Sequence, residues 1–437
     1  MLKRILGIMI CALLLGGYTD TSHASSLAEP KDEYVIVIDP GHGGSNCGTT
    51  SNENFMEKEI TLKTAKGLVD ELSKYDGVKV IMTRSGDEEL SLKERAVYAK
   101  EVGADYLFSL HYNASENHTM FGTEVWIPLY SPYHAPCYQF AYLHQLQMQE
   151  LGLFSRGIKT RINEQGTDYY GVIRESVALG VPAVIIEHCY VDESRDIGYC
   201  DEDADYVEFG KRDAIAIAQF LGLESVEEDV SIWNMTAQDI VAGTYEDRTK
   251  PDSCDIVAEY MDRENKLLTL TVKASDKDSA IMYYDYTTDG GVTFSKLYPW
   301  PQSNMLTGEY DKEFSLILEL DEAKAHMVYV RAYNKFDLYK ESNVLSNFKS
   351  IADKPQNLTE SKEPSSLEGE GTTKTEGVVQ EGTKQDTSNY QEYVPVLSEK
   401  ENNQSVRSVI LCLFVVIWTV LLIAMGVVVY RFFVKRK

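Results

Sequence analysis

The sequence is short of basic residues. It has 42 lysines and arginines against 68 aspartates and glutamates among 437 residues, for a formal net charge of −26. A nucleic-acid partner requires a basic face, so this balance argues against one. Cysteine is also sparse, at 7 residues, which excludes a fold built mainly on disulfides. Hydrophobic residues make up an ordinary 43%, enough for a sizeable core in two or three domains.

The N-terminus has the pattern of a secretory signal. Lys3 and Arg4 form a basic start, an apolar run covers residues 5–16, and Ser22-His-Ala24 places small residues where a signal peptidase cleaves. The apolar run is too short to span a bilayer. We therefore expect residues 1–24 to be a signal peptide that directs the rest of the chain out of the cytoplasm.

The C-terminus has a different pattern. Residues 409–430 form an apolar run of 22 residues, long enough to cross a hydrocarbon layer of about 30 Å. A helix buried in a protein core is the alternative, but this run has no polar face. Residues 431–437 are basic, and the preference of basic residues for the cytoplasm places this tail inside. We expect a single-pass transmembrane helix in the cell membrane, with the main part of the chain extracytoplasmic.

Strand and helix patterns alternate over residues 31–224. The short apolar run Val35–Ile38 is typical of a strand covered on both faces, and apolar residues recur at helical spacing after Glu57. Ser91 and Glu94 have the spacing of a capping box at a helix start. Further strands are expected at 78–82, 106–110 and 183–186, and further helices at 139–151 and 212–221. The alternation predicts an α/β fold with a mostly parallel twisted sheet flanked by helices.

The second half of the chain changes in character. Residues 229–349 lack helical periodicity and contain apolar runs separated by turn signals such as Asp289-Gly-Gly. We expect a small all-β sandwich of the immunoglobulin or fibronectin kind. Residues 350–404 have few apolar residues and more acids than bases, so they cannot bury enough surface to fold. We expect an acidic disordered linker there.

Five of the cysteines lie between the expected signal peptide and the expected membrane helix. An odd number leaves at least one thiol without a partner in the chain. The sequence allows one disulfide, for example between Cys189 and Cys200, but the spacing of the cysteines does not assign the pair.

Four polar residues lie where predicted strands end or a helix begins. His42 and His111 follow strands, Glu57 starts a helix, and Glu187 ends a strand. In a parallel sheet, ligands gather at the carboxyl ends of the strands, so we expect these side chains to share one site. Two histidines and a glutamate can hold a zinc ion and leave a position for water, while a further carboxylate takes the proton of that water. The pattern predicts a hydrolytic zinc centre.

Each of these residues also has a simpler interpretation when taken alone. The Gly-His-Gly-Gly sequence around His42 is more often only a turn, and acids such as Glu57 favour the first turn of any helix. Asp39 could orient His42 or only shape its loop. Arg174 could meet a substrate carboxylate or form a surface ion pair.

The four residues lie within a longer series of motifs. In order, these are Asp39-Pro-Gly-His-Gly-Gly44, Met56-Glu-Lys-Glu59, Val80-Ile-Met-Thr-Arg84, Ser91-Leu-Lys-Glu-Arg95, Ser109-Leu-His-Tyr-Asn-Ala114, Arg156-Gly157 and Val181-Pro-Ala-Val-Ile-Ile-Glu187. In this order and spacing, they resemble the catalytic domain of the zinc-dependent N-acetylmuramoyl-L-alanine amidases of bacterial cell walls. The resemblance covers residues 33–223, which is under half of the chain.

The resemblance implies a role for each of the four residues. It assigns His42, Glu57 and His111 as ligands of one zinc ion and Glu187 as the catalytic carboxylate. It implies hydrolysis of the amide between N-acetylmuramic acid and L-alanine in peptidoglycan. The sequence departs from the family pattern at Tyr112, where a small residue is common. It departs again at residues 188–190, where His-Cys-Tyr follows the catalytic glutamate.

Together these patterns predict a cell-wall amidase that is exported and anchored in the cell membrane. Peptidoglycan is the expected substrate, and the β-sandwich could bind wall glycan, bind another protein or act as a spacer. Two other functions stay open. One is a zinc peptidase that cuts peptidoglycan stem peptides, and the other is a non-catalytic wall-binding or adhesion protein with the same fold.

Overall fold

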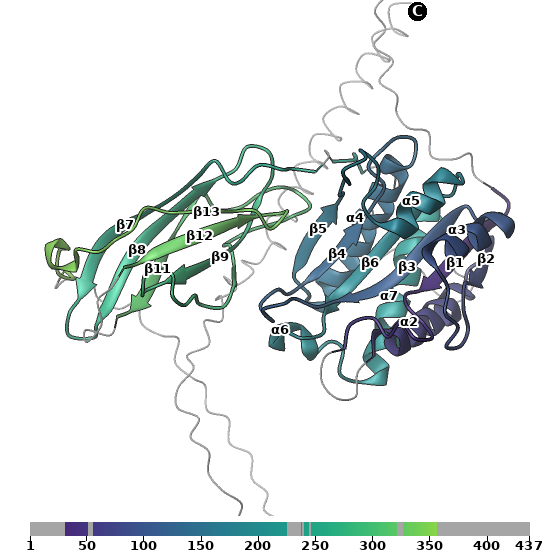
Figure 1. Ribbon diagram of the computed structural model, residues 1–437, viewed down its shortest axis with the longest axis horizontal. Helices are drawn as coiled ribbons and strands as arrows, with labels where there is room; N and C mark the ends of the chain where they lie inside the picture. The colour runs from purple at the N-terminus through teal and green to yellow at the C-terminus, as the bar shows by residue number, and fades with distance from the viewer. Residues whose placement is uncertain are drawn as a thin grey trace, which may run out of the picture. The chain divides into compact units, whose positions relative to one another are not determined.

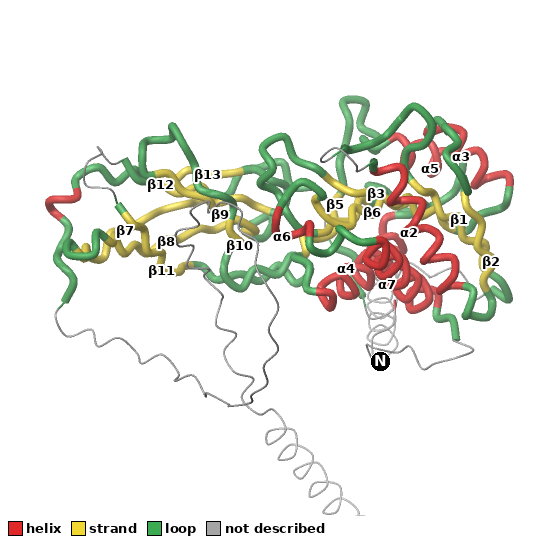
Figure 2. The backbone as a smooth tube through the Cα atoms, turned by 90° about the horizontal axis from the view of Figure 1, so that it is seen from below, coloured by secondary structure: helices red, strands yellow, loops and turns green. Residues whose placement is uncertain are grey.

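The fold is known from a computed structural model. It describes residues 31–50, 56–224, 237, 240–243, 246–320 and 327–355. Four predictions lie outside the described residues: the signal peptide at 1–24, the linker at 350–404 beyond residue 355, the transmembrane helix at 409–430 and the basic tail at 431–437. Among the described helices, none combines the length and the apolar character needed to cross a membrane. All described residues belong to one compact unit, in which an α/β domain precedes a β domain (Figures 1 and 2).

A six-stranded sheet forms the centre of the α/β domain, in the order β2-β1-β3-β6-β4-β5. The strands are β1 (Tyr34–Pro40), β2 (Val78–Met82), β3 (Tyr106–Asn113), β4 (Thr123–Trp126), β5 (Ser155–Lys159) and β6 (Ala183–Tyr190). Strands β2, β1, β3 and β6 are parallel, β4 is antiparallel to β6, and β5 is parallel to β4. The prediction of a mostly parallel sheet is confirmed.

Helices cover both faces of this sheet, as Figure 1 shows. They are α2 (Glu57–Leu72), α3 (Leu92–Glu101), α4 (His134–Leu151), α5 (Gly171–Ala178), α6 (Ser194–Ile197) and α7 (Asp203–Leu221). On one face, Ile36 and Ile38 of β1 pack in one cluster with residues of α2, α4 and α7. On the other face, Val37 packs in a second cluster with residues of α3 and α5. Because alternate side chains of β1 enter opposite cores, its sequence is continuously apolar.

The capping box forms where the sequence predicted it, but several strands and helices are longer than predicted. In the capping box, the Ser91 side chain accepts from the Glu94 amide and the Glu94 side chain accepts from the Ser91 amide. Strands β3 and β6 continue beyond residues 110 and 186. His111 and Glu187 therefore lie inside strands and are held by the sheet itself.

The β domain is a sandwich of two antiparallel sheets, as expected. One sheet has the order β10-β9-β12-β13 and the other β11-β8-β7. The strands are β7 (Ser253–Asp262), β8 (Leu267–Ser275), β9 (Ile281–Thr287), β10 (Tyr298–Pro299), β11 (Glu313–Glu319), β12 (Tyr329–Asn334) and β13 (Tyr339–Glu341), and the 3₁₀-helix η2 covers Phe348–Ser350. Leu270 of one sheet and Val330 of the other pack in one core with Trp300.

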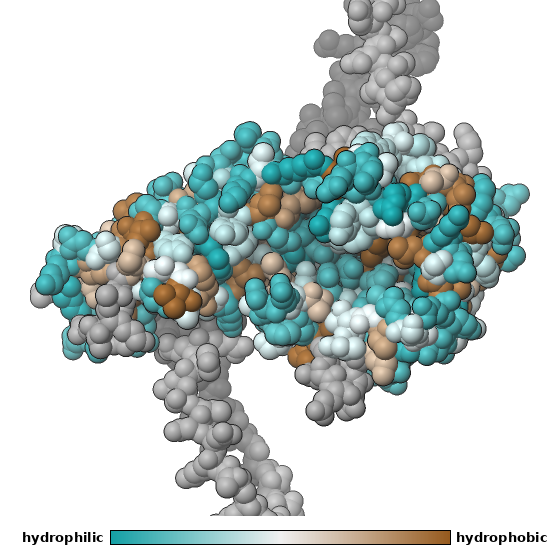
Figure 3. Space-filling view, viewed as in Figure 1, coloured by the Kyte–Doolittle hydropathy of each residue, from teal (hydrophilic) through white to brown (hydrophobic). Residues whose placement is uncertain are grey.

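The two domains share buried contacts within the compact unit. Phe121 of the α/β domain packs in one cluster with Met282, Tyr283 and Met305 of the β domain. Tyr283 donates a hydrogen bond of 2.5 Å to the Phe121 carbonyl. Over the visible face in Figure 3, hydrophilic residues predominate and hydrophobic residues form smaller patches among them.

Candidate metal centre

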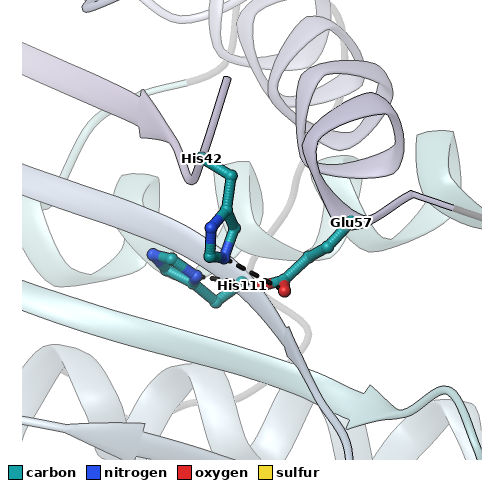
Figure 4. Close-up of side chains that lie close together, drawn as sticks. All are labelled: His42, Glu57 and His111. Carbon is teal, nitrogen blue, oxygen red and sulfur yellow. Dashed lines mark hydrogen bonds and ion pairs between the residues drawn. The ribbon is translucent and has the colours of Figure 1, made fainter. Parts of the chain in front are cut away.

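His42, Glu57 and His111 converge at one end of the sheet, as the sequence predicted (Figure 4). Nε2 of His42 lies 3.0 Å from Oε2 of Glu57, and Nδ1 of His111 lies 3.0 Å from Oε1. Each imidazole thus faces its own oxygen of one carboxylate. Potential ligand atoms of all three residues lie within 4.8 Å of one another.

The fold brings these residues together because β1 and β3 are parallel neighbours. The Gly41 amide donates to the Leu110 carbonyl at 2.9 Å, so the loop after β1 continues alongside β3. His42 then takes a left-handed backbone conformation, with φ of 65°, and turns back over the end of the sheet. Glu57 reaches the same point from the first residue of α2.

Two buried arginines hold the loop that carries His42. Arg84 donates through Nη2 to the Gly41 carbonyl at 2.8 Å, and Arg95 donates through Nη2 to the His42 carbonyl at 2.7 Å. Arg95 also donates through Nη1 to Asp39 at 2.6 Å. Arg95 therefore bridges Asp39 and the backbone carbonyl of His42. Of the two roles expected for Asp39 from the sequence, these contacts favour support of the loop. Sequence reasoning did not assign this role to the arginines, although both lie in the quoted motifs.

The electrostatics of the centre suit a cation. Burial alone would raise the pKa of Glu57, but His111 and His42 outweigh this and hold it well below its usual value. Burial would lower the pKa of His42, yet its hydrogen bond and ion pair with Glu57 raise it above the usual value. Two imidazoles and one carboxylate are a donor set found in catalytic zinc sites, which use three protein ligands and keep one position open. The residues present therefore fit a zinc ion.

Glu187 lies beside this centre, opposite His111 in the β3–β6 ladder. Its Oε2 atom is shielded from solvent and has no hydrogen-bond partner among the described residues. Burial raises the pKa of this carboxyl well above its usual value, and the nearby charges of Glu57 and Glu124 add to the effect. A divalent cation in the centre would lower the pKa of Glu187, because its positive charge favours the carboxylate form. The carboxyl is thus placed to exchange a proton.

A pocket of about 830 Å³ opens beside the centre and is lined by His42 and His111. Arg174 also lines this pocket and donates through Nη1 to the carbonyls of Asp168 and Tyr169, at 2.9 and 2.8 Å. Its nearest acid, Glu175, is 3.9 Å away. These contacts fix the guanidinium at the pocket wall.

None of the described cysteines belongs to the group formed by His42, Glu57 and His111. Within the described ranges, the five cysteines at positions 47, 137, 189, 200 and 254 are free thiols. Cys189 and Cys200 are both buried and their thiols are in contact, but they form no disulfide.

The comparisons with known proteins agree with the motifs. Residues 36–219 match the family model described as N-acetylmuramoyl-L-alanine amidase. The N-acetylmuramoyl-L-alanine amidase CwlM of Bacillus licheniformis is 34% identical over 163 residues, which are 37% of this chain and 58% of that protein. The sporulation-specific N-acetylmuramoyl-L-alanine amidase of Bacillus subtilis is 34% identical over 162 residues, with the same two coverages of 37% and 58%. The chain thus spans somewhat over half of the length of these relatives.

Among solved structures, the chain is similar to an N-acetylmuramoyl-L-alanine amidase from Clostridium difficile 630. The two are 29% identical, the alignment covers 44% of this chain and 98% of that chain, and the TM-score is 0.39. Residues 36–219 are a domain of the N-acetylmuramoyl-L-alanine amidase family, and the family expected from the motifs is confirmed. The family match ends before β7, so the β domain lies outside it.

Proposed function

We propose that this chain hydrolyses the amide bond between N-acetylmuramic acid and L-alanine in peptidoglycan, with one zinc ion held by His42, Glu57 and His111. The observation that carries the proposal is their convergence. Two imidazoles lie 3.0 Å from the two oxygens of a single buried carboxylate, within a domain of the amidase family. The pocket beside them offers room for a sugar and part of a peptide.

Glu187 is the proposed catalytic acid and base. Zinc, when bound, would polarise the substrate carbonyl and make water more acidic. Oε2 of Glu187 has no hydrogen-bond partner among the described residues, so it can accept the proton of the attacking water. The same oxygen then passes that proton to the leaving amine of L-alanine. Burial raises the pKa of this carboxyl above its usual value, which is the direction that favours a carboxyl group as a proton donor.

We also propose that the enzyme works outside the membrane on a tether. The signal pattern at 1–24, the linker composition at 350–404 and the apolar run at 409–430 support this location, and the basic tail supports a cytoplasmic C-terminus. The β-sandwich would lie between the catalytic domain and the linker, where it can bind wall glycan or protein or act as a spacer.

The test combines zinc content with product analysis for the full-length protein on purified peptidoglycan. We expect about one zinc per chain and peptides that begin with L-alanine, and a chelator should abolish their release. Peptides cut within the stem would identify a peptidase instead. Glu187→Gln should keep zinc and lower turnover by roughly 10²–10⁴-fold, the range typical of general acid–base catalysis.

The matched control is Glu101→Gln, which removes an exposed carboxylate from the end of α3 in the same domain. Turnover of this control should stay within about twofold of the unchanged protein, because surface substitutions away from the site have small effects. A Glu187→Gln protein that releases peptides at the unchanged rate would refute the proposed role of Glu187.

A further inference from the structure

His188 stands where this sequence departs from the family pattern, directly after Glu187. It is fully buried. Because side chains alternate along a strand, His188 points to the face of β6 opposite Glu187. Its Nδ1 lies 3.0 Å from the backbone carbonyl of His111, and its Nε2 lies 2.9 Å from Oδ2 of Asp213 in α7. The side chain thus connects a proposed metal ligand to a helix behind the sheet.

The strand pairing is irregular at this point. The β3–β6 register shifts between His111 and Asn113, beside the proposed metal centre, because two residues of β6, His188 and Cys189, lie opposite Tyr112 alone. The ring of Tyr112 stacks on the imidazole of His188 with centroids 4.9 Å apart. The Tyr112 amide donates to Oε1 of Glu57 at 3.0 Å. His188 therefore supports a dipeptide that contributes one proposed ligand and orients another.

Asp213 holds His188 in place. Its other oxygen, Oδ1, lies 2.9 Å from Nε2 of His144 in α4, so one carboxylate serves two imidazoles on separate oxygens. All three side chains have no exposed surface. Because the His111 carbonyl can only accept a hydrogen bond, Nδ1 of His188 is the donor in that contact.

The same three residues also have the composition of a metal site. Potential ligand atoms of His144, His188 and Asp213 lie within 4.8 Å of one another. However, a closed zinc site takes four protein ligands, and this cluster offers three with no access for water. One nitrogen of His188 is already directed at the His111 carbonyl. The contacts favour a hydrogen-bonded support.

We propose that His188 is a positioning residue for the metal centre. Its hydrogen bond to the His111 carbonyl fixes the backbone from which the His111 imidazole reaches the metal, and Asp213 fixes the orientation of His188. This inference rests on the proposed zinc centre. Outer residues that orient metal ligands typically change metal affinity by about 10–100-fold when removed.

The test measures the zinc affinity of the full-length protein by competition with a chelator, in three variants. His188→Asn and His188→Leu both remove the ring and the contact with Asp213. They are similar in shape, but only the amide nitrogen of asparagine can replace Nδ1 as a donor to the carbonyl. We expect His188→Leu to lower zinc affinity by about 10–100-fold and His188→Asn to recover most of it.

His144→Leu is the matched control, because it removes the other imidazole from Asp213 and leaves the His188–His111 contact in place. It should destabilise the protein comparably in thermal unfolding while changing zinc affinity by less than about threefold. The absorption spectrum of the cobalt-substituted protein gives a second readout, and it should change in His188→Leu and not in His144→Leu.

Each outcome separates the two proposals. Failure of the unchanged protein to bind zinc would overturn the proposed metal centre itself. Zinc binding with equal affinities for His188→Leu and His188→Asn would leave that centre standing and overturn the positioning role. Two zinc ions in the unchanged protein and one in His144→Leu would replace the positioning role by a second metal site. If His188→Leu does not fold, His188→Phe, which keeps an aromatic ring and lacks both donors, takes its place in the comparison.

Discussion

Gly41 contributes to the proposed metal centre by having no side chain. A Cβ atom at this position would lie 2.3 Å from Cε1 and 2.6 Å from Nε2 of His111. Real Cβ atoms do not approach ring atoms so closely, and the interior around them is close-packed. The imidazole of His111 therefore occupies space that any other residue at position 41 would need.

We predict that Gly41→Ala displaces the His111 ring and weakens zinc binding by at least about tenfold, with a stability loss of about 1–3 kcal/mol from overpacking. Chelator competition and thermal unfolding measure the two effects. Gly198→Ala is the control, because Gly198 has an ordinary φ of −69° and a Cβ atom there would meet open space. Equal zinc affinities of the two variants would contradict the prediction.

The loop after β1 depends on a buried carboxylate at the end of that strand. Asp39 accepts hydrogen bonds from Thr83 at 2.6 Å, from Arg95 at 2.6 Å and from Ser109 at 2.7 Å. These partners come from the segment after β2, from α3 and from β3. The carboxylate thus joins three elements to the loop that carries His42, and Arg95 is almost fully buried with it.

We predict that Asp39→Asn destabilises the protein by about 3–5 kcal/mol, because it leaves the charge of Arg95 buried without its anion. Urea unfolding of the full-length protein measures this change. The control is Glu208→Gln, which affects a half-buried carboxylate paired with Arg212 across a turn of α7 and should cost no more than about 0.5 kcal/mol. A common urea midpoint for the two variants would show that the Asp39 network contributes little.

In the molecule as a whole, a charge cluster joins the β-sandwich to the edge of the α/β sheet. Arg156 is 1% exposed and donates to both oxygens of Asp337 in the β domain, at 2.9 and 2.8 Å. Arg156 and Lys159 also pair with Glu124 of β4, each at 2.8 Å. Glu124 is opposite Glu187 in the β4–β6 ladder. The domain contact therefore extends to the strand beside Glu187, the proposed catalytic residue.

We predict that Asp337→Asn lowers the stability of the full-length protein by about 1–3 kcal/mol, because two buried cations are left with Glu124 as their nearest anion. The effect should fall below that of a fully buried pair, since 33% of the Asp337 side chain is exposed. Asp353→Asn is the control in the same domain. It removes an exposed partner of Arg263, with side chains 43% and 77% exposed, and should change stability by at most about 0.5 kcal/mol.

Parallel shifts of the urea midpoint in Asp337→Asn and Asp353→Asn would mean that the domain contact does not depend on the cluster. A second unfolding transition in Asp337→Asn alone would be the strongest support, because it would show that this contact makes the two domains unfold together.

The sequence by itself determined the features that depend on neighbouring residues. A continuous apolar run indicated β1, and the Ser91 and Glu94 pair indicated the start of α3. Alternation of strand and helix patterns indicated the α/β sheet, and apolar runs with turn signals indicated the β-sandwich. The motifs around His42, Glu57, His111 and Glu187 predicted one shared site. Such signals are readable because strand and helix periodicity and capping act within a few residues.

Only the tertiary structure decided the contacts between distant segments. Strand β4 has four residues and needs its neighbours in the sheet to form, so it gave no usable local signal. His188 was recognised as unusual, but its partner Asp213 lies 25 residues away, and Arg156 meets Asp337 across 181 residues. A hydrogen bond or an ion pair depends on distance in space, and the packing of helices and sheets sets that distance. The sequence therefore indicated the proposed ligands themselves. The hydrogen bonds and ion pairs that hold them in place depend on the folded structure.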